Sequence, residues 1–210
     1  MNNPIKNIIF DFGGVILNVN PMAFATGLTE LGCKDMEGLH NRFIKDNVYM
    51  RFEKGQMSPA TFRAELKSAL NNHVTDIQID WAWNLILGNF TQEPIRFLTE
   101  IKRQFRTFLL SNTNSIHYDC FQTEFRKKFN SNSMDELFEK AYYSFQMNLY
   151  KPEPEIFEYV INDSRLNPEE TLFVDDNILN IESASQCGLQ TLHYVENAGS
   201  ALGKTVLDRV

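Results

Sequence analysis

A short apolar run that ends in an acid and two glycines constrains the fold of this chain most. Residues 8–10 (Ile-Ile-Phe) form a continuous apolar segment, which is typical of a strand buried on both faces of a sheet. Asp11 follows at once, and a carboxylate there is costly to bury unless a cation or hydrogen-bond donors meet it. Gly13 and Gly14 then allow a sharp turn and the close approach of a ligand. This order is typical of the active-site edge of an α/β sheet, although Asp11 could also cap an ordinary turn.

Strand-like and helix-like segments alternate in the second part of the chain. Short apolar runs predict further strands at residues 107–110, 141–145, 171–174 and 190–194. Apolar residues at helical spacing predict helices at residues 93–103, 116–129, 155–162 and 178–187. Because strands that alternate with helices form right-handed βαβ units, we predict an α/β fold with a parallel sheet flanked by helices.

The segment between the first two predicted strands contains helix signals and no convincing strand. Ser58 followed by Pro59 is typical of an N-cap and a first helical residue. Helices are predicted at residues 21–31, 36–46, 59–70 and 77–87. We therefore predict two domains: a core formed by residues 1–17 and 91–210, and an all-helical insertion of residues 18–90.

Composition excludes several classes of protein. The chain has 210 residues, of which 43% are hydrophobic, and this is enough for a sizeable core. Its net charge of −7 argues against a basic nucleic-acid-binding face and against binding to anionic membranes. The three cysteines lack CxxC spacing, so neither a disulfide framework nor a zinc site is expected. We see no signal peptide and no membrane span, and we expect a cytoplasmic protein.

Polar residues follow three of the predicted strands. These are Asp11, the pair Ser111-Asn112 and the pair Asp175-Asp176. Because the carboxyl ends of parallel strands share one edge of the sheet, we expect these side chains to converge. Three carboxylates would repel one another, and Mg²⁺ would relieve this repulsion while leaving room for a substrate phosphate oxygen. Ser111 and Asn112, with backbone N–H groups, would offer neutral donors to that phosphate.

Lys151 precedes two prolines and follows a predicted strand, so a stiff local backbone could direct its ammonium group into the same site. It could hold a nucleophilic carboxylate and a phosphoryl group together. Each feature also has an ordinary explanation: Asp176 and Asn177 could cap the next helix, residues 111–114 could form a turn, and Lys151 could be solvated. Their combination, in order and at strand ends, favours a functional site.

These segments resemble the four motifs of the haloacid dehalogenase superfamily. The matching segments are residues 8–15 with Asp11, residues 109–112 with Ser111, residues 151–157 with Lys151, and residues 173–177 with Asp175 and Asp176, followed by Asn180. The resemblance covers nearly the whole chain and includes a helical insertion between the first two motifs. It implies a Rossmann-like core with an inserted all-helical cap that covers the site.

The resemblance also implies a metal site and a nucleophile. Asp11 would attack phosphorus and form an aspartyl-phosphate. Mg²⁺ would be held by Asp11, the backbone carbonyl of Gly13 and Asp176, with Asp175 bound directly or through water. Ser111, Asn112 and Lys151 would bind the transferring group.

Gly13 departs from the pattern of most phosphatases in this superfamily, which carry a second Asp at that position as acid and then base. General acid–base help is typically worth about 10²–10⁴-fold. The sequence resembles a subgroup, including bacterial sugar-1-phosphate phosphatases, that also shows Gly there. Residues near Tyr49, Met50 and Arg51 could face the substrate or pack within the insertion.

We therefore predict a Mg²⁺-dependent phosphomonoester hydrolase that acts on a small phosphorylated metabolite, with sugar phosphates as one candidate class. Neither a nucleic acid nor a membrane is an expected partner. Two alternatives stay open. A 2-haloacid dehalogenase would use the same Asp nucleophile against carbon without a metal, and a catalytically weak phosphate-binding protein would explain the absence of an acid at Gly13.

Overall fold

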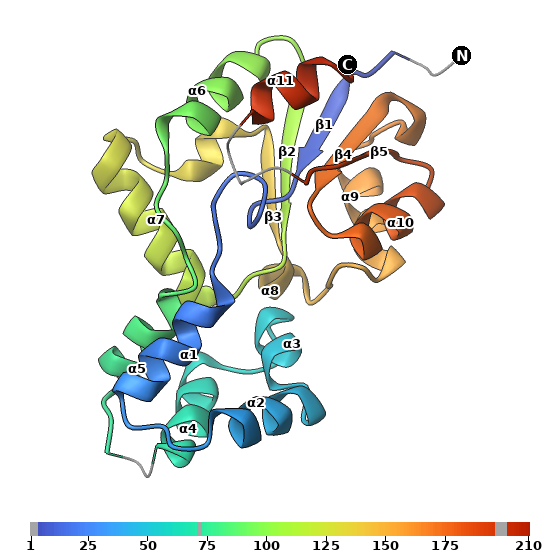
Figure 1. Cartoon of the computed structure of the whole chain (residues 1–210). Helices are drawn as coiled ribbons and strands as arrows, with labels where there is room; N and C mark the ends of the chain where they lie inside the picture. Colours follow the sequence, from blue (N-terminus) through green and yellow to red (C-terminus); the bar gives the residue numbers. More distant parts are fainter. Residues whose placement is uncertain (1–3, 71–72, 196–200) are drawn as a thin grey trace.

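A parallel sheet runs through the upper part of the molecule in Figure 1, which is a computed structural model that describes residues 4–70, 73–195 and 201–210. In the described residues the sheet has five strands in the order β3-β2-β1-β4-β5. The strands are β1 (Asn7–Phe10), β2 (Arg106–Ser111), β3 (Lys140–Tyr143), β4 (Thr171–Asp175) and β5 (Gln190–His193). Helices flank the sheet, so the predicted α/β class with a parallel sheet is confirmed.

Helices cover both faces of this sheet. One apolar cluster joins the sheet to α6 (Gln92–Ile101), α7 (Ser115–Phe129), α11 (Leu202–Leu207) and the 3₁₀ segment η1 (Met134–Leu137). Another joins it to α9 (Pro154–Asp163) and α10 (Ile178–Gln186). The short α8 (Ser144–Met147) follows β3, and η2 (Pro168–Glu170) precedes β4.

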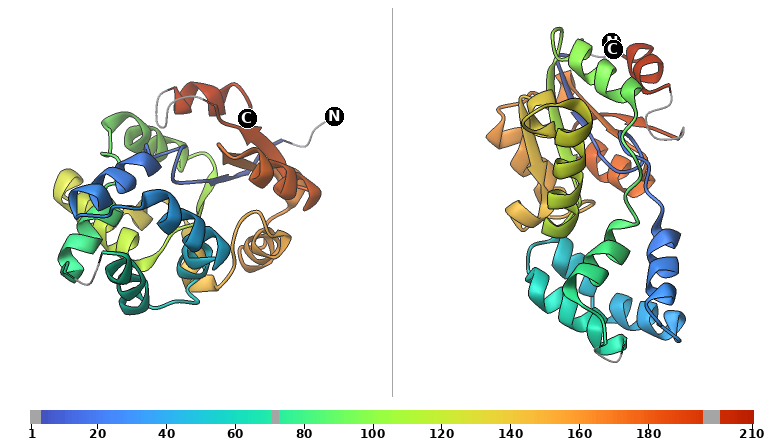
Figure 2. Two further views of the ribbon diagram at one scale, coloured as in Figure 1. Left: turned by 60° about the horizontal axis from the view of Figure 1, so that its bottom comes forward. Right: turned by 90° about the vertical axis from the view of Figure 1, so that its left-hand side faces the viewer.

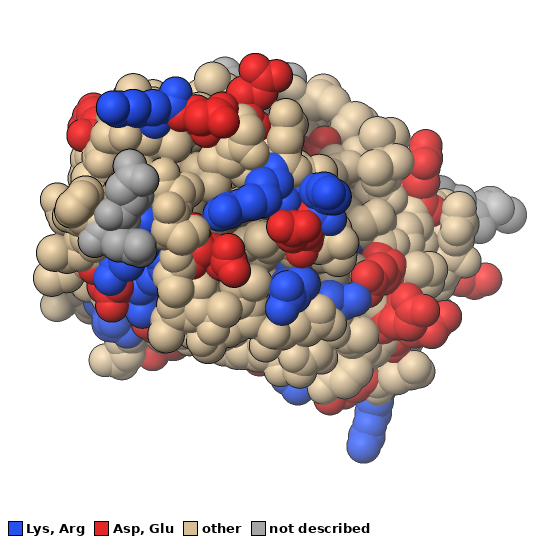
Figure 3. Space-filling view, turned by 90° about the horizontal axis from the view of Figure 1, so that it is seen from below, with Lys and Arg blue, Asp and Glu red and all other residues tan. Residues whose placement is uncertain are grey.

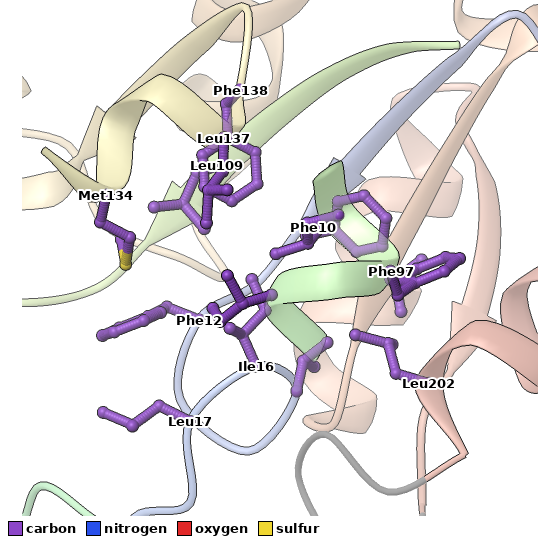
Figure 4. Packing of buried hydrophobic residues seen from close by; sticks show 14 of the residues in the cluster. Phe10, Phe12, Ile16, Leu17, Phe97, Leu109, Met134, Leu137, Phe138 and Leu202 are labelled. Atoms are coloured by element: carbon purple, nitrogen blue, oxygen red, sulfur yellow. The ribbon is translucent and has the colours of Figure 1, made fainter. Parts of the chain in front are cut away.

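The first strand is buried on both faces, as its sequence predicts. Ile8 and Phe10 point into the cluster with α6 and α7, while Ile9 points into the cluster with α9 and α10. Phe10 meets Phe97 of α6 edge to face, with ring centroids 6.2 Å apart and an interplanar angle of 87° (Figure 4). This packing fixes the end of β1 and therefore the position of Asp11.

In the described residues between β1 and α6 there are five helices, and we call them the helical insert. They are α1 (Pro21–Glu30), α2 (Met36–Lys45), α3 (Val48–Glu53), α4 (Pro59–Ala69) and α5 (Asp76–Asn84). They share an apolar cluster of their own and lie beyond the carboxyl ends of the strands (Figures 1 and 2). Four of them match predicted helices, and α3 was not predicted. The domain boundaries at residues 18 and 90 stay a prediction.

Local hydrogen bonds explain where the helices of the insert begin. The Ser58 hydroxyl accepts from the backbone N–H of Thr61 at 3.1 Å, as expected for an N-cap before Pro59. Thr75 and Gln78 form a reciprocal capping box at the start of α5. These caps fix the helix starts at positions that the sequence pattern indicates.

The insert is joined to the core by two chain segments and by side-chain contacts. The backbone of Asn20 donates to Ile86 O at 2.8 Å, so the outgoing and returning segments run side by side (Figure 2). Trp83 of α5 donates from Nε1 to Asn114 Oδ1 at 3.2 Å and stacks on His117 of α7, with centroids 4.6 Å apart. These contacts hold the insert over the edge of the sheet where the polar residues emerge.

Several element ends differ from the prediction by one to three residues, and local contacts explain two of these differences. β3 ends at Tyr143, two residues early, because the Ser144 hydroxyl accepts from Thr113 N at 2.9 Å and Ser144 begins α8. The predicted helix of residues 77–87 ends at Asn84, because the chain there turns into the segment that returns to the core.

The outer face of the insert carries both signs of charge. Seen from below, Lys and Arg side chains are interspersed with Asp and Glu side chains rather than gathered on one side (Figure 3). Among the described helices, none has both the length and the apolar character that crossing a bilayer requires.

Candidate active site

Two buried acids meet one buried lysine at the carboxyl edge of the sheet. Lys151 Nζ donates to Asp11 Oδ1 at 2.6 Å and to Asp175 Oδ2 at 2.7 Å. The side chains of Lys151 and Asp175 are 1% and 0% exposed, so these ion pairs are shielded from water. A single ammonium group therefore neutralises part of the charge of two carboxylates in a nearly dry site.

Strand register brings these acids together. Phe10 of β1 is paired with Val174 of β4, and the N–H of Asp11 donates to Val174 O at 2.9 Å. Asp11 and Asp175 thus leave neighbouring strands at the same level. The convergence that the parallel arrangement predicts is present.

Asp175 is held by donors on every side. Its Oδ1 accepts from the N–H of Asn177 at 2.8 Å, and Asn180 Nδ2 lies 3.0 Å from both carboxylate oxygens. With Lys151 on Oδ2, both oxygens already accept hydrogen bonds from the protein. The role of Asn180, in the first turn of α10, is to orient this carboxylate.

Asn112 fixes the backbone of Lys151. Its Nδ2 donates to Lys151 O at 2.9 Å, and its Oδ1 accepts from Lys151 N at 3.0 Å. Ser111, at the end of β2, is buried and has only a long contact of 3.4 Å from its hydroxyl to Asn112 O. The structure thus leaves the Ser111 hydroxyl able to donate to a bound anion, while Asn112 positions the lysine.

Asp176 lies across from the glycine turn. One carboxylate oxygen from each of Asp11, Asp175 and Asp176 can be chosen so that the three lie within 4.8 Å of one another. Gly14 has φ +83°, and a Cβ there would lie 2.1 Å from Asp176 Oδ2. Only glycine therefore permits both this turn and this carboxylate position.

Burial dominates the electrostatics of these groups. Burial raises the pKa of Asp11 to about 7, with Lys151 opposing the rise and Asp175 adding to it. Burial alone would lower the pKa of Lys151, but Asp11 and Asp175 outweigh it and the pKa lies above its usual value. Burial and the nearby Asp175 also raise the pKa of Asp176. Additional positive charge beside Asp11 and Asp176 would favour their ionised forms.

A cavity of about 480 Å³ opens onto this cluster, between the core and the helical insert. It is lined by all the predicted site residues except the fully buried Asp175, namely Asp11, Gly13, Ser111, Asn112, Lys151 and Asp176. Its size suits one small molecule. The sequence-based prediction thus named residues that the fold brings to one place.

The cavity wall also includes titratable residues that were not predicted as site residues: Glu53, His117 and Tyr150. Burial raises the pKa of Glu53 to about 6 and lowers the pKa of His117 to about 3. Tyr49, which was considered as a residue facing the site, instead packs inside the insert, with its ring 5.9 Å from that of Trp83. Glu53 lies on the same short helix, and no periodic signal marks α3 in the sequence.

Comparison with known proteins agrees with this geometry. The family model described as "Hydrolase: haloacid dehalogenase-like hydrolase" matches residues 5–188. The chain belongs to the haloacid dehalogenase-like hydrolases. The predicted family and enzyme class are thereby confirmed for this hydrolase.

Relatives of this hydrolase include phosphatases. It is 32% identical to a D-ribitol-5-phosphate phosphatase of Bacteroides thetaiotaomicron over 89% of this chain and 90% of the relative. A crystal structure of HAD family enzyme bt-2542 from the same species, in complex with magnesium and inorganic phosphate, has a TM-score of 0.85 at 34% identity and covers 93% and 96% of the two chains. A predicted HAD-like family hydrolase from Porphyromonas gingivalis has a TM-score of 0.85 at 31% identity and covers 99% and 100%.

Proposed function

We propose that this hydrolase is a Mg²⁺-dependent phosphomonoester phosphatase that works through an aspartyl-phosphate on Asp11. The observation that carries the proposal is the convergence of Asp11, Lys151 and Asp176 on one cavity that Ser111 also lines. A nucleophilic carboxylate, a fixed cation, an acidic metal position and a neutral donor are the groups that phosphoryl transfer needs.

The residues fit a magnesium ion. Mg²⁺ prefers a few carboxylate oxygens, retained waters and a phosphate oxygen, and the carboxylates of Asp11 and Asp176 with the carbonyl of Gly13 would supply such a set. Asp175 would act through water, because its two oxygens already accept from Lys151, Asn177 and Asn180. When bound, the ion would supply positive charge beside the phosphate oxygens and keep Asp11 ionised.

The side chains divide the chemistry between them. A carboxylate oxygen of Asp11 forms a bond to phosphorus while the bond from phosphorus to the substrate oxygen breaks, and the alcohol leaves. Water then attacks phosphorus, releases inorganic phosphate and restores the Asp11 carboxylate. Lys151, held by Asn112, keeps Asp11 in position, and the Ser111 hydroxyl donates to the transferring phosphate.

Charge indicates the substrate class. Among the described residues that line the cavity, Lys151 is the one Lys or Arg, and two acids already surround it. Glu53 adds a further acidic group on the side of the insert and no positive charge. A leaving group with a second phosphate or a carboxylate would meet only repulsion there, so we expect a neutral, hydroxylated leaving group. The relative that is named as a ribitol-phosphate phosphatase supports a sugar or sugar alcohol phosphate.

Phosphate release tests the proposal. Purified protein should release phosphate from a panel of sugar and sugar alcohol monophosphates, D-ribitol 5-phosphate included, in the presence of Mg²⁺ and not in excess chelator. Asp11→Asn should retain the fold and lose turnover, because an amide cannot replace the nucleophile. Trapping with fluoroberyllate should place the phosphate mimic on Asp11.

The same assay separates the alternatives. Full activity in excess chelator, or wild-type rates in Asp11→Asn, would exclude the metal-assisted covalent mechanism. Release of halide from 2-haloacids without metal would favour a dehalogenase. Tight binding of phosphate with no turnover of any monoester would favour a binding protein.

A further inference from the structure

We propose that Glu53, the last residue of α3 in the helical insert, is the acid that protonates the leaving oxygen of the substrate. This inference rests on the proposed phosphatase function. As Asp11 bonds to phosphorus, the bond from phosphorus to the leaving oxygen breaks with its electrons going to that oxygen, which takes the proton of the Glu53 carboxyl group. The Glu53 carboxylate then takes a proton from the water that attacks the aspartyl-phosphate, so both acids return to their starting states.

The chemistry requires such a group if the substrate is a sugar alcohol phosphate. A primary alkoxide is a poor leaving group and departs readily only when it is protonated as the bond breaks. Gly13 has no side chain that could do this. General acid help of this kind is typically worth about 10²–10⁴-fold, so the donor has to come from another part of the cavity wall.

The fold places Glu53 on the part of the cavity wall that the insert forms. Glu53 lines the same cavity as Asp11 and Gly13, but it comes from the insert rather than from the sheet. Figure 1 shows α3 directly below α8, at the carboxyl edge of the strands. A substrate whose phosphate lies on Asp11 would therefore direct its leaving group toward the insert, where Glu53 lies.

Contacts with the core fix Glu53 in this position. Its backbone carbonyl accepts from the Ser144 hydroxyl at 2.6 Å, and its Oε2 accepts from the Tyr150 hydroxyl at 2.9 Å. Two residues later, Gly55 has φ +70° and packs so closely that a Cβ would lie 2.1 Å from Phe145 O. In the described residues Oε1 has no hydrogen-bond partner, so this oxygen is left for a ligand.

The environment favours proton exchange near neutral pH. Burial raises the pKa of the Glu53 carboxyl group to about 6, and the hydrogen bond from Tyr150 partly opposes this rise. The other charged or titratable groups around the carboxyl group and across the cavity are Lys54, which is paired with Glu153 at 2.7 Å, and His117, Asp11, Lys151 and Asp176. Glu53 is thus a carboxyl group that can give and regain a proton under working conditions.

The other titratable groups of the cavity wall are less suited to this role. His117 is neutral, because burial lowers its pKa to about 3, and its Nδ1 lies 3.0 Å from Asn84 Oδ1. The Tyr150 hydroxyl is committed to Glu53, and burial raises its pKa. Asp176 lies beside Gly14 in the proposed metal position.

A comparison of leaving groups tests the role of Glu53. Wild type and Glu53→Gln, which keeps the size and shape of the side chain, are assayed on D-ribitol 5-phosphate and on 4-nitrophenyl phosphate with Mg²⁺. The value of kcat/KM covers the steps up to loss of the leaving group, so later hydrolysis of the phosphoenzyme does not enter. We expect a loss of about 10²-fold or more on the alkyl phosphate and little change on the aryl phosphate, whose leaving group needs no proton.

Glu153→Gln is the matched control. It removes the ion pair with Lys54, a neighbouring contact between insert and core, but Glu153 does not line the cavity. If Glu53 acted only by docking the insert, both variants would lose activity, and each would lose it equally on the two substrates. The proposal instead predicts a selective loss in Glu53→Gln alone.

The pH profile gives a second, independent measurement. The substrate phosphate titrates in every variant, so we compare kcat/KM profiles of wild type and Glu53→Gln on the alkyl phosphate. An alkaline decrease that disappears in Glu53→Gln belongs to Glu53. In Tyr150→Phe this decrease should move to higher pH, because the lost hydrogen bond no longer lowers the pKa of Glu53.

The outcomes distinguish this inference from the function on which it rests. Release of 4-nitrophenol by wild type but not by Asp11→Asn establishes the phosphatase. With that established, equal losses of Glu53→Gln on both substrates, or an unchanged pH profile, would overturn the role of Glu53. So would a wild type that hydrolyses the aryl phosphate and no alkyl phosphate. If no monoester is hydrolysed at all, the proposed function itself is wrong.

Discussion

Replacing Lys151 by Met removes the positive charge that lies between the two buried acids of the described site, Asp11 and Asp175. The methionine side chain has a similar length, so packing changes little while the ammonium group is lost. Asp11 and Asp175, whose side chains are 11% and 0% exposed, would then face each other without a cation. Breaking a buried ion pair by removing one partner typically costs about 3–5 kcal/mol of unfolding free energy.

An exposed ion pair provides the control for this magnitude. Lys6 pairs with Glu170 at 2.8 Å, but the Lys6 side chain is 61% exposed. Pairs of this kind contribute about 0–1 kcal/mol, because water already solvates both charges. Lys6→Met should therefore lose several-fold less stability than Lys151→Met, although both variants remove one lysine and one ion pair or more.

Urea unfolding in the presence of chelator measures both variants, and pH identifies the cause. Burial already raises the pKa of Asp11 from 3.8 to about 7, so its contribution to stability is complete below about pH 3.8 and is lost as the pH rises through about 7. Without Lys151, which lowers this pKa, the loss at neutral pH should be larger. At about pH 5, protonation of Asp11 should bring Lys151→Met closer to wild type.

The result that would refute this reasoning is specific. If Lys151→Met unfolds at the same urea concentration as Lys6→Met at neutral pH, the two acids do not depend on Lys151 for their charge balance. A deficit that is equal at neutral pH and at about pH 5 would instead indicate a packing defect.

Two further substitutions test the glycine turn. Gly14→Ala should cost about 1–2 kcal/mol of backbone strain and also weaken Mg²⁺ binding in titration calorimetry, because its Cβ would displace Asp176. Gly32 has φ +94°, and a Cβ added there would have no atom within 4 Å apart from its chain neighbours, so Gly32→Ala should show the strain alone. Gly13→Asp should fold, because no positive φ occurs there and its Cβ would meet only Val19, at 3.2 Å. In the Glu53→Gln background it should restore part of the alkyl phosphate hydrolysis, and a double variant as slow as Glu53→Gln alone would argue against a missing acid.

The parts of the site that follow from strand geometry could be predicted from the sequence. Three apolar runs end in polar residues, and parallel pairing must bring such ends to one edge. Asp11, Ser111 and Asp175 therefore lie where the pattern indicates. Burial of residues 8–10 on both faces follows from the same pattern, because a central strand of a parallel sheet has no solvent-facing side.

The details of side-chain pairing could not be predicted, because they depend on rotamers and loop conformation rather than on periodicity. Asn112 was predicted to bind substrate, and the structure shows its amide group on the backbone of Lys151. Whether it also contacts substrate stays a prediction. Asn180 was noted only as part of a motif, and its place beside both oxygens of Asp175 requires the turn between β4 and α10.

Glu53 shows why the side of the site formed by the insert is harder to predict than the sheet edge. Its partners Ser144 and Tyr150 are 91 and 97 residues away in the chain, and they meet it only after the insert has docked on the core. The six-residue α3 carries no amphipathic repeat long enough to fix its orientation. The sequence shows that position 13 carries no acidic side chain. The acid proposed in its place, Glu53, reaches the site only through the packing of the insert on the core. A chemical step in this fold can therefore depend on a contact that no local sequence pattern encodes. For this reason Glu53→Gln should slow hydrolysis of the alkyl phosphate more than that of the aryl phosphate, whereas substitution of Glu153, the ion-pair partner of Lys54, should not.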